Sequence, residues 1–311
     1  MHKRFNISTS THDSSEPPSA STKFKWDVAV VAEKSDLDDR SIAARNYATV
    51  NSVRTITVKF DLSANETLID GKVSTFGGLR AQFFRQKCVL IEATTLSVIE
   101  ILYVVAAAVK ENVTQLRLVY VEPLDYRRRI EGRLCEHRDF DLSVNSLYRS
   151  IPMFRTDLNE TTPGRAVFFL GYEGSRLGQA LEQEEILQHW KKHMILGVPA
   201  FEPGWEIDSI ANNIQYFREQ DTVQFAAASS VTGAYSLLCE LREQEKESKP
   251  ILVAPIGTKP HAIGAILFLI EFDAMEQAVL LYDHPYRSQG RTDKIRRWHF
   301  YDVADNNTHA S

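Results

Sequence analysis

Apolar and polar positions follow two periodicities in the first half of this chain. Residues 27–32 and 53–62 form short runs rich in Val, Ile and Phe, and a polar-apolar pattern typical of a helix covers 37–47 between them. Apolar strands at 88–91 and 116–121 flank an apolar helical segment at 97–110, which is too short to span a bilayer. This βαβ unit predicts parallel strands covered on both faces.

The same pattern restarts after the break at Thr161-Thr162-Pro163-Gly164. Strands are predicted at 166–170 and 194–198, helices at 176–190, 209–219 and 231–247, and a last βαβ unit from 251 to 282. We therefore expect an α/β protein with Rossmann-like, mainly parallel sheets flanked by helices, in two related halves. Their expected bounds are 24–150 and 161–305. Residues 1–23, rich in Ser, Thr and Pro, predict a disordered tail.

The two βαβ units align without a gap at a constant offset of 162 residues. Val89-Leu90-Ile91 corresponds to Ile251-Leu252-Val253, and Tyr120 and Pro123 correspond to Tyr282 and Pro285. A duplicated half explains the alignment, but two βαβ units of ordinary length would also align. In either case the turns after the aligned strands are expected at the carboxyl edge of a sheet, where α/β proteins bind ligands.

Composition narrows the class of protein. The 311 residues carry a net charge of −5 and a pI near 6.0, so a basic surface for nucleic acid remains possible but is not indicated. Cys88, Cys135 and Cys239 are too few and too scattered for a disulfide framework or a zinc site. The N-terminus lacks the apolar stretch of a secretory signal. We expect a cytoplasmic protein without membrane association, metal or cofactor.

The turn Pro255-Ile256-Gly257-Thr258-Lys259-Pro260-His261 is the best candidate for a ligand site. Gly257 allows a close backbone approach, Thr258 suits a helix N-cap, and Lys259 supplies a cation. The amides of the following helix start favour an anion. The spacing matches neither a Walker A loop nor a dinucleotide fingerprint. An ordinary capped turn between strand and helix is the alternative interpretation.

Two further segments supply polar groups near strand ends. Glu173 and Arg176 lie in the turn Gly171–Arg176 and are candidates for binding a ribose or base. Arg287 begins a basic, aromatic segment beyond the last parallel strand, which suits phosphate but is also compatible with an ordinary charged loop.

An acidic loop precedes the first predicted helix. Asp36, Asp38 and Asp39 together have the ligand type for a divalent ion, although a helix start stabilised by its dipole is the better interpretation. In an enzyme these carboxylates, or His261 and His284 as proton carriers, would supply the chemistry. No nucleophile elbow is present.

The segment Ala254-Pro255-Ile256-Gly257-Thr258-Lys259 resembles the Gly-Thr-Lys turn of CRISPR-associated Rossmann-fold (CARF) sensor domains, although it lacks their first glycine. The wider layout is similar to uncharacterised Rossmann-like proteins of prokaryotic defence neighbourhoods, through Asp39-Arg40-Ser41, Tyr120–Pro123 and Gly171–Arg176. The resemblance implies a bacterial protein that senses a nucleotide signal, with Gly257, Thr258 and Lys259 matching the sensor motif.

We therefore expect a nucleotide-sensing or regulatory protein, a component of an antiviral defence system that takes a phosphate-bearing nucleotide and acts as a homodimer or with a partner protein of a defence complex. Two other functions stay open. One is a metal-dependent enzyme acting on nucleotides or nucleic acid, and the other is a structural subunit of a defence complex. Whether the protein is an enzyme is not decided by the sequence.

Overall fold

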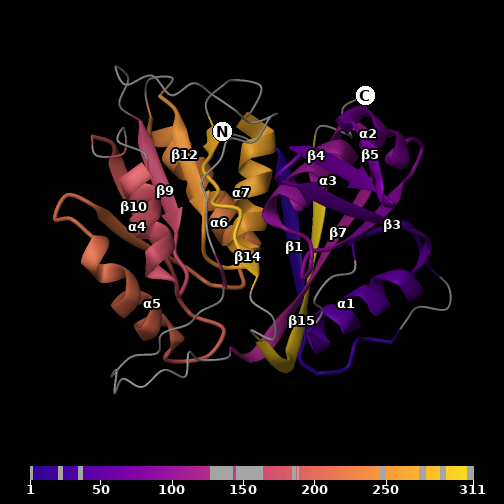
Figure 1. Ribbon diagram of the computed structural model, residues 1–311, viewed down its shortest axis with the longest axis horizontal. Coiled ribbons are helices and arrows are strands. Elements are labelled where there is room, and N and C mark those ends of the chain that lie inside the picture. The colour runs from indigo at the N-terminus through magenta and orange to yellow at the C-terminus, as the bar shows by residue number, and fades with distance from the viewer. Residues whose placement is uncertain are drawn as a thin grey trace. The chain divides into compact units, whose positions relative to one another are not determined.

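The computed structural model describes residues 3–19, 24–33, 38–126, 143–144, 164–183, 187, 189–245, 249–272, 278–287 and 292–306. The chain forms two compact units, each with its own sheet (Figure 1). We call them the terminal unit, made of His2–Tyr126 and Thr292–Ser311, and the central unit, Arg127–Arg291.

The terminal unit is built on an eight-stranded mixed sheet of order β1-β15-β7-β6-β2-β3-β4-β5. The four strands β7, β6, β2 and β3 are parallel, and the remaining neighbours pair antiparallel. The strands are β1 (Phe5–His12), β2 (Trp26–Ala32), β3 (Ser52–Asp61), β4 (Glu66–Ile69), β5 (Lys72–Ser74), β6 (Cys88–Glu92), β7 (Gln115–Tyr126) and β15 (Thr292–Asp305).

Helices α1 (Asp39–Val50), α2 (Phe76–Phe83) and α3 (Val98–Lys110) belong to this sheet. The steps from β2 to β3 and from β6 to β7 run in opposite directions, so right-handed crossovers place α1 and α3 on opposite faces. Ala44 and Ala48 of α1 pack with Leu90 and Val119. Almost every residue of α3 is buried, as its uniformly apolar sequence predicts.

The central unit is built on a five-stranded sheet in which every neighbouring pair is parallel. Its order is β11-β10-β9-β12-β13. The strands are β9 (Arg165–Phe169), β10 (Lys191–Gly197), β11 (Thr222–Ala226), β12 (Ile251–Pro255) and β13 (Ala278–Leu280). A short pair, β8 (Ser143–Val144) with β14 (Tyr286–Arg287), is separate from this sheet.

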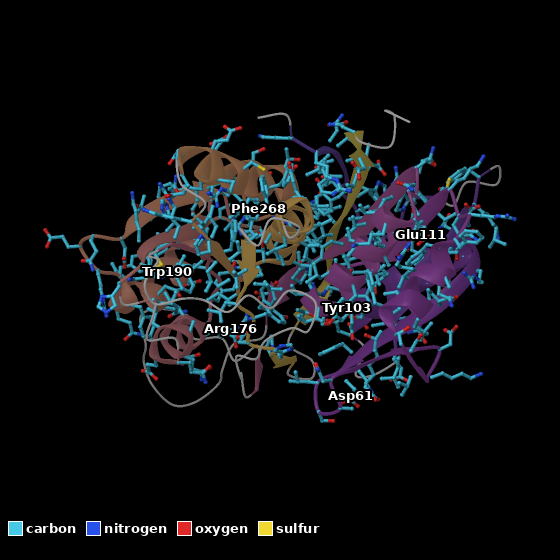
Figure 2. The ribbon with its side chains drawn as sticks, turned by 90° about the horizontal axis from the view of Figure 1, so that it is seen from above. Asp61, Tyr103, Glu111, Arg176, Trp190 and Phe268 are labelled. Atoms are coloured by element: carbon cyan, nitrogen blue, oxygen red, sulfur yellow. The ribbon has the colours of Figure 1, made fainter. Side chains whose placement is uncertain are left out.

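Helices cover both faces of the central sheet. They are α4 (Gly174–Gln183), α5 (Trp205–Asn213), α6 (Val231–Gln244) and α7 (Lys259–Phe272), with a 3₁₀ turn at Ile214–Tyr216. Leu177 and Ala180 of α4 pack with Phe168, Met194 and Leu252 in one core. Helices α6 and α7 pack on each other. The side chains fill the space between helices and sheet, with Trp190 and Phe268 labelled in the central unit (Figure 2).

The expected α/β fold is confirmed, and both predicted βαβ units are present as β6-α3-β7 and β12-α7-β13. The expectation of mainly parallel sheets holds for the central unit, whereas the terminal sheet is mixed. The sequence pattern also missed β4, β5, α2 and β11, because these elements are short or partly exposed. No helix among the described residues is long and apolar enough to cross a membrane.

The chain termini differ from expectation. Within the expected disordered tail, residues 5–12 form β1, which pairs antiparallel with β15 from Phe5 opposite Asp305 to His12 opposite Trp298. Strand β15, expected in the second half of the chain, pairs with β7 of the first sheet. Polar composition misled the prediction, because an edge strand needs apolar residues on one face only, and its partner here lies almost 300 residues away. The expected boundary between 150 and 161 lies outside the described residues.

The strand assignment of residues 5–12 predicts an asymmetry between two phenylalanines. Phe5 is 3% exposed and Phe24 is 43% exposed. Phe5→Ala should lower the free energy of unfolding by about 3 kcal/mol, since it removes a buried ring. Phe24→Ala should cost less than about 1 kcal/mol. Urea unfolding of the full chain measures both, and equal small effects would contradict a structured β1.

Candidate functional site

The turns after β9 and β12 lie side by side at the carboxyl edge of the central sheet. These strands are neighbours, with Phe169 opposite Pro255 at their ends. The strand order reverses between them, because β10 and β11 continue on one side of β9 while β12 and β13 continue on the other. In open α/β sheets this reversal leaves a crevice in which ligands bind.

Gly257 brings the two turns into contact. A Cβ atom at this position would lie 2.5 Å from the carbonyl oxygen of Leu170, a contact that no side chain tolerates. A Cβ atom on Gly171 would in turn lie 3.1 Å from Cα of Gly257. The sequence predicted that Gly257 allows a ligand to approach the backbone closely. In the structure, the group that approaches Gly257 is the neighbouring turn of the protein.

Arg176, which is labelled in Figure 2, lies in the first turn of α4. Its side chain is buried and binds other groups of the protein. Its guanidinium donates to both carboxylate oxygens of Asp283, with Nη2 2.6 Å from Oδ1, and Nη1 donates to the carbonyl of Ile256 at 2.7 Å. Burial by itself lowers the pKa of Arg176, but the charge of Asp283 and its hydrogen bonds outweigh burial and raise it. Arg176 therefore fixes the turn rather than presenting a free cation.

Helix α5 holds the other turn through side chains. Ser209 and Asn213 donate to the carbonyl of Gly171 at 3.0 and 2.8 Å, and Asn212 donates to the carbonyl of Tyr172 at 2.8 Å. Sequence analysis identified none of these anchors. A polar residue on a helix is a weak signal, because its partner in a distant turn is fixed only by tertiary packing.

Thr258 and His261 join the start of α7 to the loop after β11. The Thr258 hydroxyl donates to the carbonyl of Ala228 at 2.7 Å and accepts from the amide of His261 at 3.4 Å, which makes it a helix cap as the sequence predicted. Nε2 of His261 lies 3.0 Å from the carbonyl of Ala227 and therefore carries the proton.

His261 is buried and neutral. Burial lowers its pKa to about 4, although hydrogen bonds to the carbonyls of Ala227 and Ala226 oppose the shift. Its ring lies against Phe169, with centroids 5.1 Å apart, and its Nδ1 meets no hydrogen-bond partner among the described residues. A histidine with this pKa stays neutral near pH 7 and is a weak base, so its place near the turn does not favour acid-base catalysis.

The turn also contains backbone donors. The amides of Gly257 and Thr258 donate to no backbone carbonyl among the described residues, and Lys259 begins the 14-residue helix α7 with its side chain half-buried. Amides at the start of a helix attract anions, because the helix dipole adds a partial positive charge. This arrangement suits a phosphate or carboxylate.

The aligned turn in the terminal unit is already occupied by a carboxylate of the chain. Glu92 accepts from the amides of Thr94 and Thr95 at 2.7 and 3.1 Å and from the Thr95 hydroxyl. Burial raises the pKa of Glu92, and these hydrogen bonds oppose the shift. The position corresponding to Glu92 in the second turn is Ala254, which has no such group.

The structure brings Glu173 and Arg176 to the same edge as Gly257, Thr258, Lys259 and His261. Glu173 Oε2 lies 3.9 Å from Nη1 of Arg176. The backbone of Arg287 lies in β14, and its side chain lies outside the described residues, as does Asp36.

The acidic loop before α1 contributes to helix capping. Asp38 accepts from the amide of Ser41 at 2.8 Å, and the pKa of Asp38 is about 2, because Arg40 and the hydrogen bonds of Ser41 and Thr292 outweigh the opposing effect of burial. The described residues contain no cluster of three potential metal-ligating side chains.

The buried ion pair predicts a non-additive pair of substitutions. Asp283 is 0% exposed, so Arg176→Ala leaves a buried carboxylate without its partner and should lower the free energy of unfolding by about 3–5 kcal/mol. The double substitution Arg176→Met with Asp283→Leu removes both charges and should cost less than Arg176→Ala alone. Urea unfolding followed by tryptophan fluorescence compares them, and a double variant less stable than the single would refute this role.

His261 predicts a pH dependence of stability. Its folded-state pKa of about 4 lies below the ordinary value of 6.5, so the unfolded chain binds a proton first as the pH falls. The contribution of neutral His261 to the free energy of unfolding should be complete above pH 6.5 and should decline towards pH 4. We expect it to fall by about 2 kcal/mol between pH 7 and 4.5. His261→Gln should reduce this slope, whereas the control His189→Gln should preserve it.

No family model and no curated protein matches this sequence.

Proposed function

We propose that this protein is a nucleotide-sensing or regulatory protein whose central unit is Rossmann-like and takes a phosphate-bearing nucleotide at the turn Gly257–Lys259. The observation that carries the proposal is the position of this turn. It follows β12 at the point where the strand order of the central sheet reverses, and the turn after β9 lies beside it. The order of the five strands is the one expected of a Rossmann fold.

The phosphate would bind at the start of α7. The amides of Gly257 and Thr258 and the dipole of a 14-residue helix supply positive potential without a full charge. In the aligned turn of the terminal unit, Glu92 accepts from the amides of Thr94 and Thr95, and the second of these corresponds to the amide of Gly257. The absence of a carboxylate at Ala254 supports an external anion at the second turn.

The surrounding residues have different roles in this proposal. Lys259 adds charge at the first residue of α7, and Glu173 is positioned to accept from a ribose or base. Arg176 donates its hydrogen bonds to Asp283 and to the carbonyl of Ile256, so its role is to hold the turn in place for the ligand. Arg287 follows β13 in the chain and remains the further candidate for a phosphate contact that the sequence predicted.

Binding is better supported than catalysis. His261 has a pKa of about 4 and is buried, and Asp38 is a helix cap. The output would therefore pass through a second copy of the chain or a partner protein of a defence complex, as the resemblance to CARF sensor domains implies. The paired βαβ units support two related halves, with the four parallel strands of the terminal sheet in a second doubly wound order.

Calorimetry of the full chain with AMP, ATP, cyclic tetra-adenylate and inorganic phosphate tests the proposal. We expect at least one nucleotide to bind, and Lys259→Ala to weaken it by about tenfold or more, because it removes a charged partner of the phosphate. Lys191→Ala is the matched control, since this exposed lysine begins β10 at the opposite edge of the sheet.

Two results would contradict the proposal. One is the absence of binding to all four probes by protein that is folded by circular dichroism. The other is equal affinity in the Lys259→Ala and wild-type proteins. Mass spectrometry of the same mixtures with Mg²⁺ or Mn²⁺ would reveal a product if the protein were instead a metal-dependent enzyme.

A further inference from the structure

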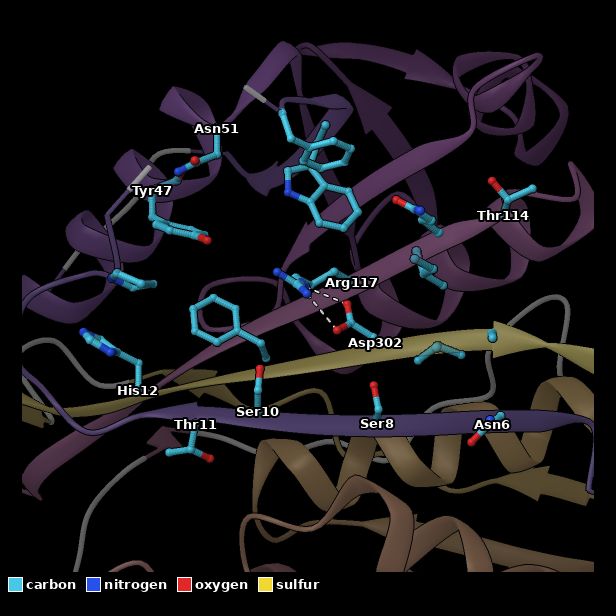
Figure 3. A pocket seen from close by; sticks show the side chains of 18 of the residues that line it. Asn6, Ser8, Ser10, Thr11, His12, Tyr47, Asn51, Thr114, Arg117 and Asp302 are labelled. Carbon is cyan, nitrogen blue, oxygen red and sulfur yellow. Dashed lines mark hydrogen bonds and ion pairs between the residues drawn. The ribbon is translucent and has the colours of Figure 1, made fainter. Parts of the chain in front are cut away.

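A cavity lies in the terminal unit, away from the carboxyl edge of its parallel strands. It is a groove of about 860 Å³ over β1, β15 and the start of β7, flanked by the end of α1 (Figure 3). Volumes of 300 to 1,000 Å³ are typical of small-molecule sites. Helix α1 covers the neighbouring part of the sheet through Ala44 and Ala48 and leaves this part open.

The floor of the groove carries one planar ion pair. Arg117 donates from Nε and Nη2 to the two carboxylate oxygens of Asp302, at 2.6 and 2.7 Å. The guanidinium carbon lies 5.3 Å from the ring centroid of Trp26 and 5.6 Å from that of Phe300. Both charged side chains remain partly exposed, at 30% and 40%, so they can meet a ligand.

The walls carry uncharged hydrogen-bonding groups. Ser8 and Ser10 point from β1 towards the ion pair, and Tyr47 lies across from them on α1 (Figure 3). Asn51, the C-cap of α1, also lines the groove, but its amide donates to the carbonyl of Tyr47 at 2.8 Å. The side chains on this face of β1 are two residues apart, about 7 Å along the strand. The exposed ring of Phe24 adds an apolar surface at one side.

The charges in the groove do not suit an anion. Among the described residues that line it, Arg117 is the one lysine or arginine and Asp302 the one acidic residue. Their bidentate pair neutralises both charges. The site therefore differs in chemistry from the turn at Gly257, and a phosphate would gain little attraction here.

The backbone of the groove floor does not suit an added peptide strand. Strands β1, β15 and β7 already pair with one another along the floor, including Ser8 with Asp302 and Asp302 with Arg117. A ligand on this face meets side chains instead of free backbone groups, whereas strand addition would use the outer edge of β1, the edge strand of this sheet.

We propose that this groove binds a neutral oligosaccharide. Adjacent sugar hydroxyls would donate to the remaining lone pairs of Asp302 and accept from the N–H groups that Arg117 does not use in the ion pair. The serines and Tyr47 would bind further hydroxyls, and Phe24 would pack on the apolar face of a ring. This inference does not depend on nucleotide binding by the central unit.

Saturation-transfer NMR and calorimetry with maltotriose, cellotriose, chitotriose, laminaritriose and mannotriose test the proposal on the full chain. We expect at least one trisaccharide to bind. Asp302→Asn should weaken binding by about tenfold or more, because a charged acceptor is lost. Asp305→Asn is the matched control, since this aspartate lies on the same strand and binds Arg4 outside the groove lining; its affinity should stay within about twofold.

Ser8→Phe places a large ring beside Asp302 in the groove and leaves the ion pair intact. It should also abolish binding, because the ring occupies the space of the ligand. It keeps the test decisive if Asp302→Asn does not fold. The proposal is overturned if no trisaccharide binds to folded protein, or if Ser8→Phe and Asp305→Asn bind equally well. Binding of penta-alanine or ATP, but of no sugar, at a site blocked by Ser8→Phe would also overturn it.

Discussion

The buried pair of Arg176 and Asp283 is the interaction on which the central unit's candidate site depends. It joins the start of α4 to the segment after β13, and the third bond of Arg176 fixes the carbonyl of Ile256 between them. A guanidinium can serve three acceptors at once, because its donors lie in one rigid plane. These bonds tie the turns at the carboxyl edge of the sheet to one another.

This rigidity has a consequence for binding. A site whose turns are already ordered loses little conformational entropy when a ligand arrives. Gly257 contributes through its contact with Leu170, and the side chains of α5 hold the carbonyl groups of the facing turn. Among the described residues of this edge, His261 is neutral and Arg176 is paired.

The candidate sites of the two units differ in electrostatic potential. At Gly257 two amides that donate to no backbone carbonyl among the described residues create positive potential together with a helix dipole, whereas in the groove of the terminal unit Arg117 and Asp302 neutralise each other's charge. The first suits an anion and the second a neutral polyhydroxyl ligand. In the terminal unit, the turn aligned with Gly257 is occupied by the carboxylate of Glu92, a residue of the chain itself.

The sequence by itself determined the features that arise from neighbouring residues. The sequence pattern predicted both βαβ units, the buried helices α3 and α7, the cap at Thr258 and the position of the turn after β12. Periodicity and capping are visible in the sequence because they depend on residues only a few positions apart. Only the tertiary structure decided the partners of Arg176, the strand β1 and the groove. Each depends on contacts between residues far apart in the chain, such as Phe5 with Asp305, and these are selected by the packing of the whole sheet. A polar strand such as β1 carries no local signal of its own, and an arginine near a strand end does not reveal whether it will face a ligand or a buried carboxylate.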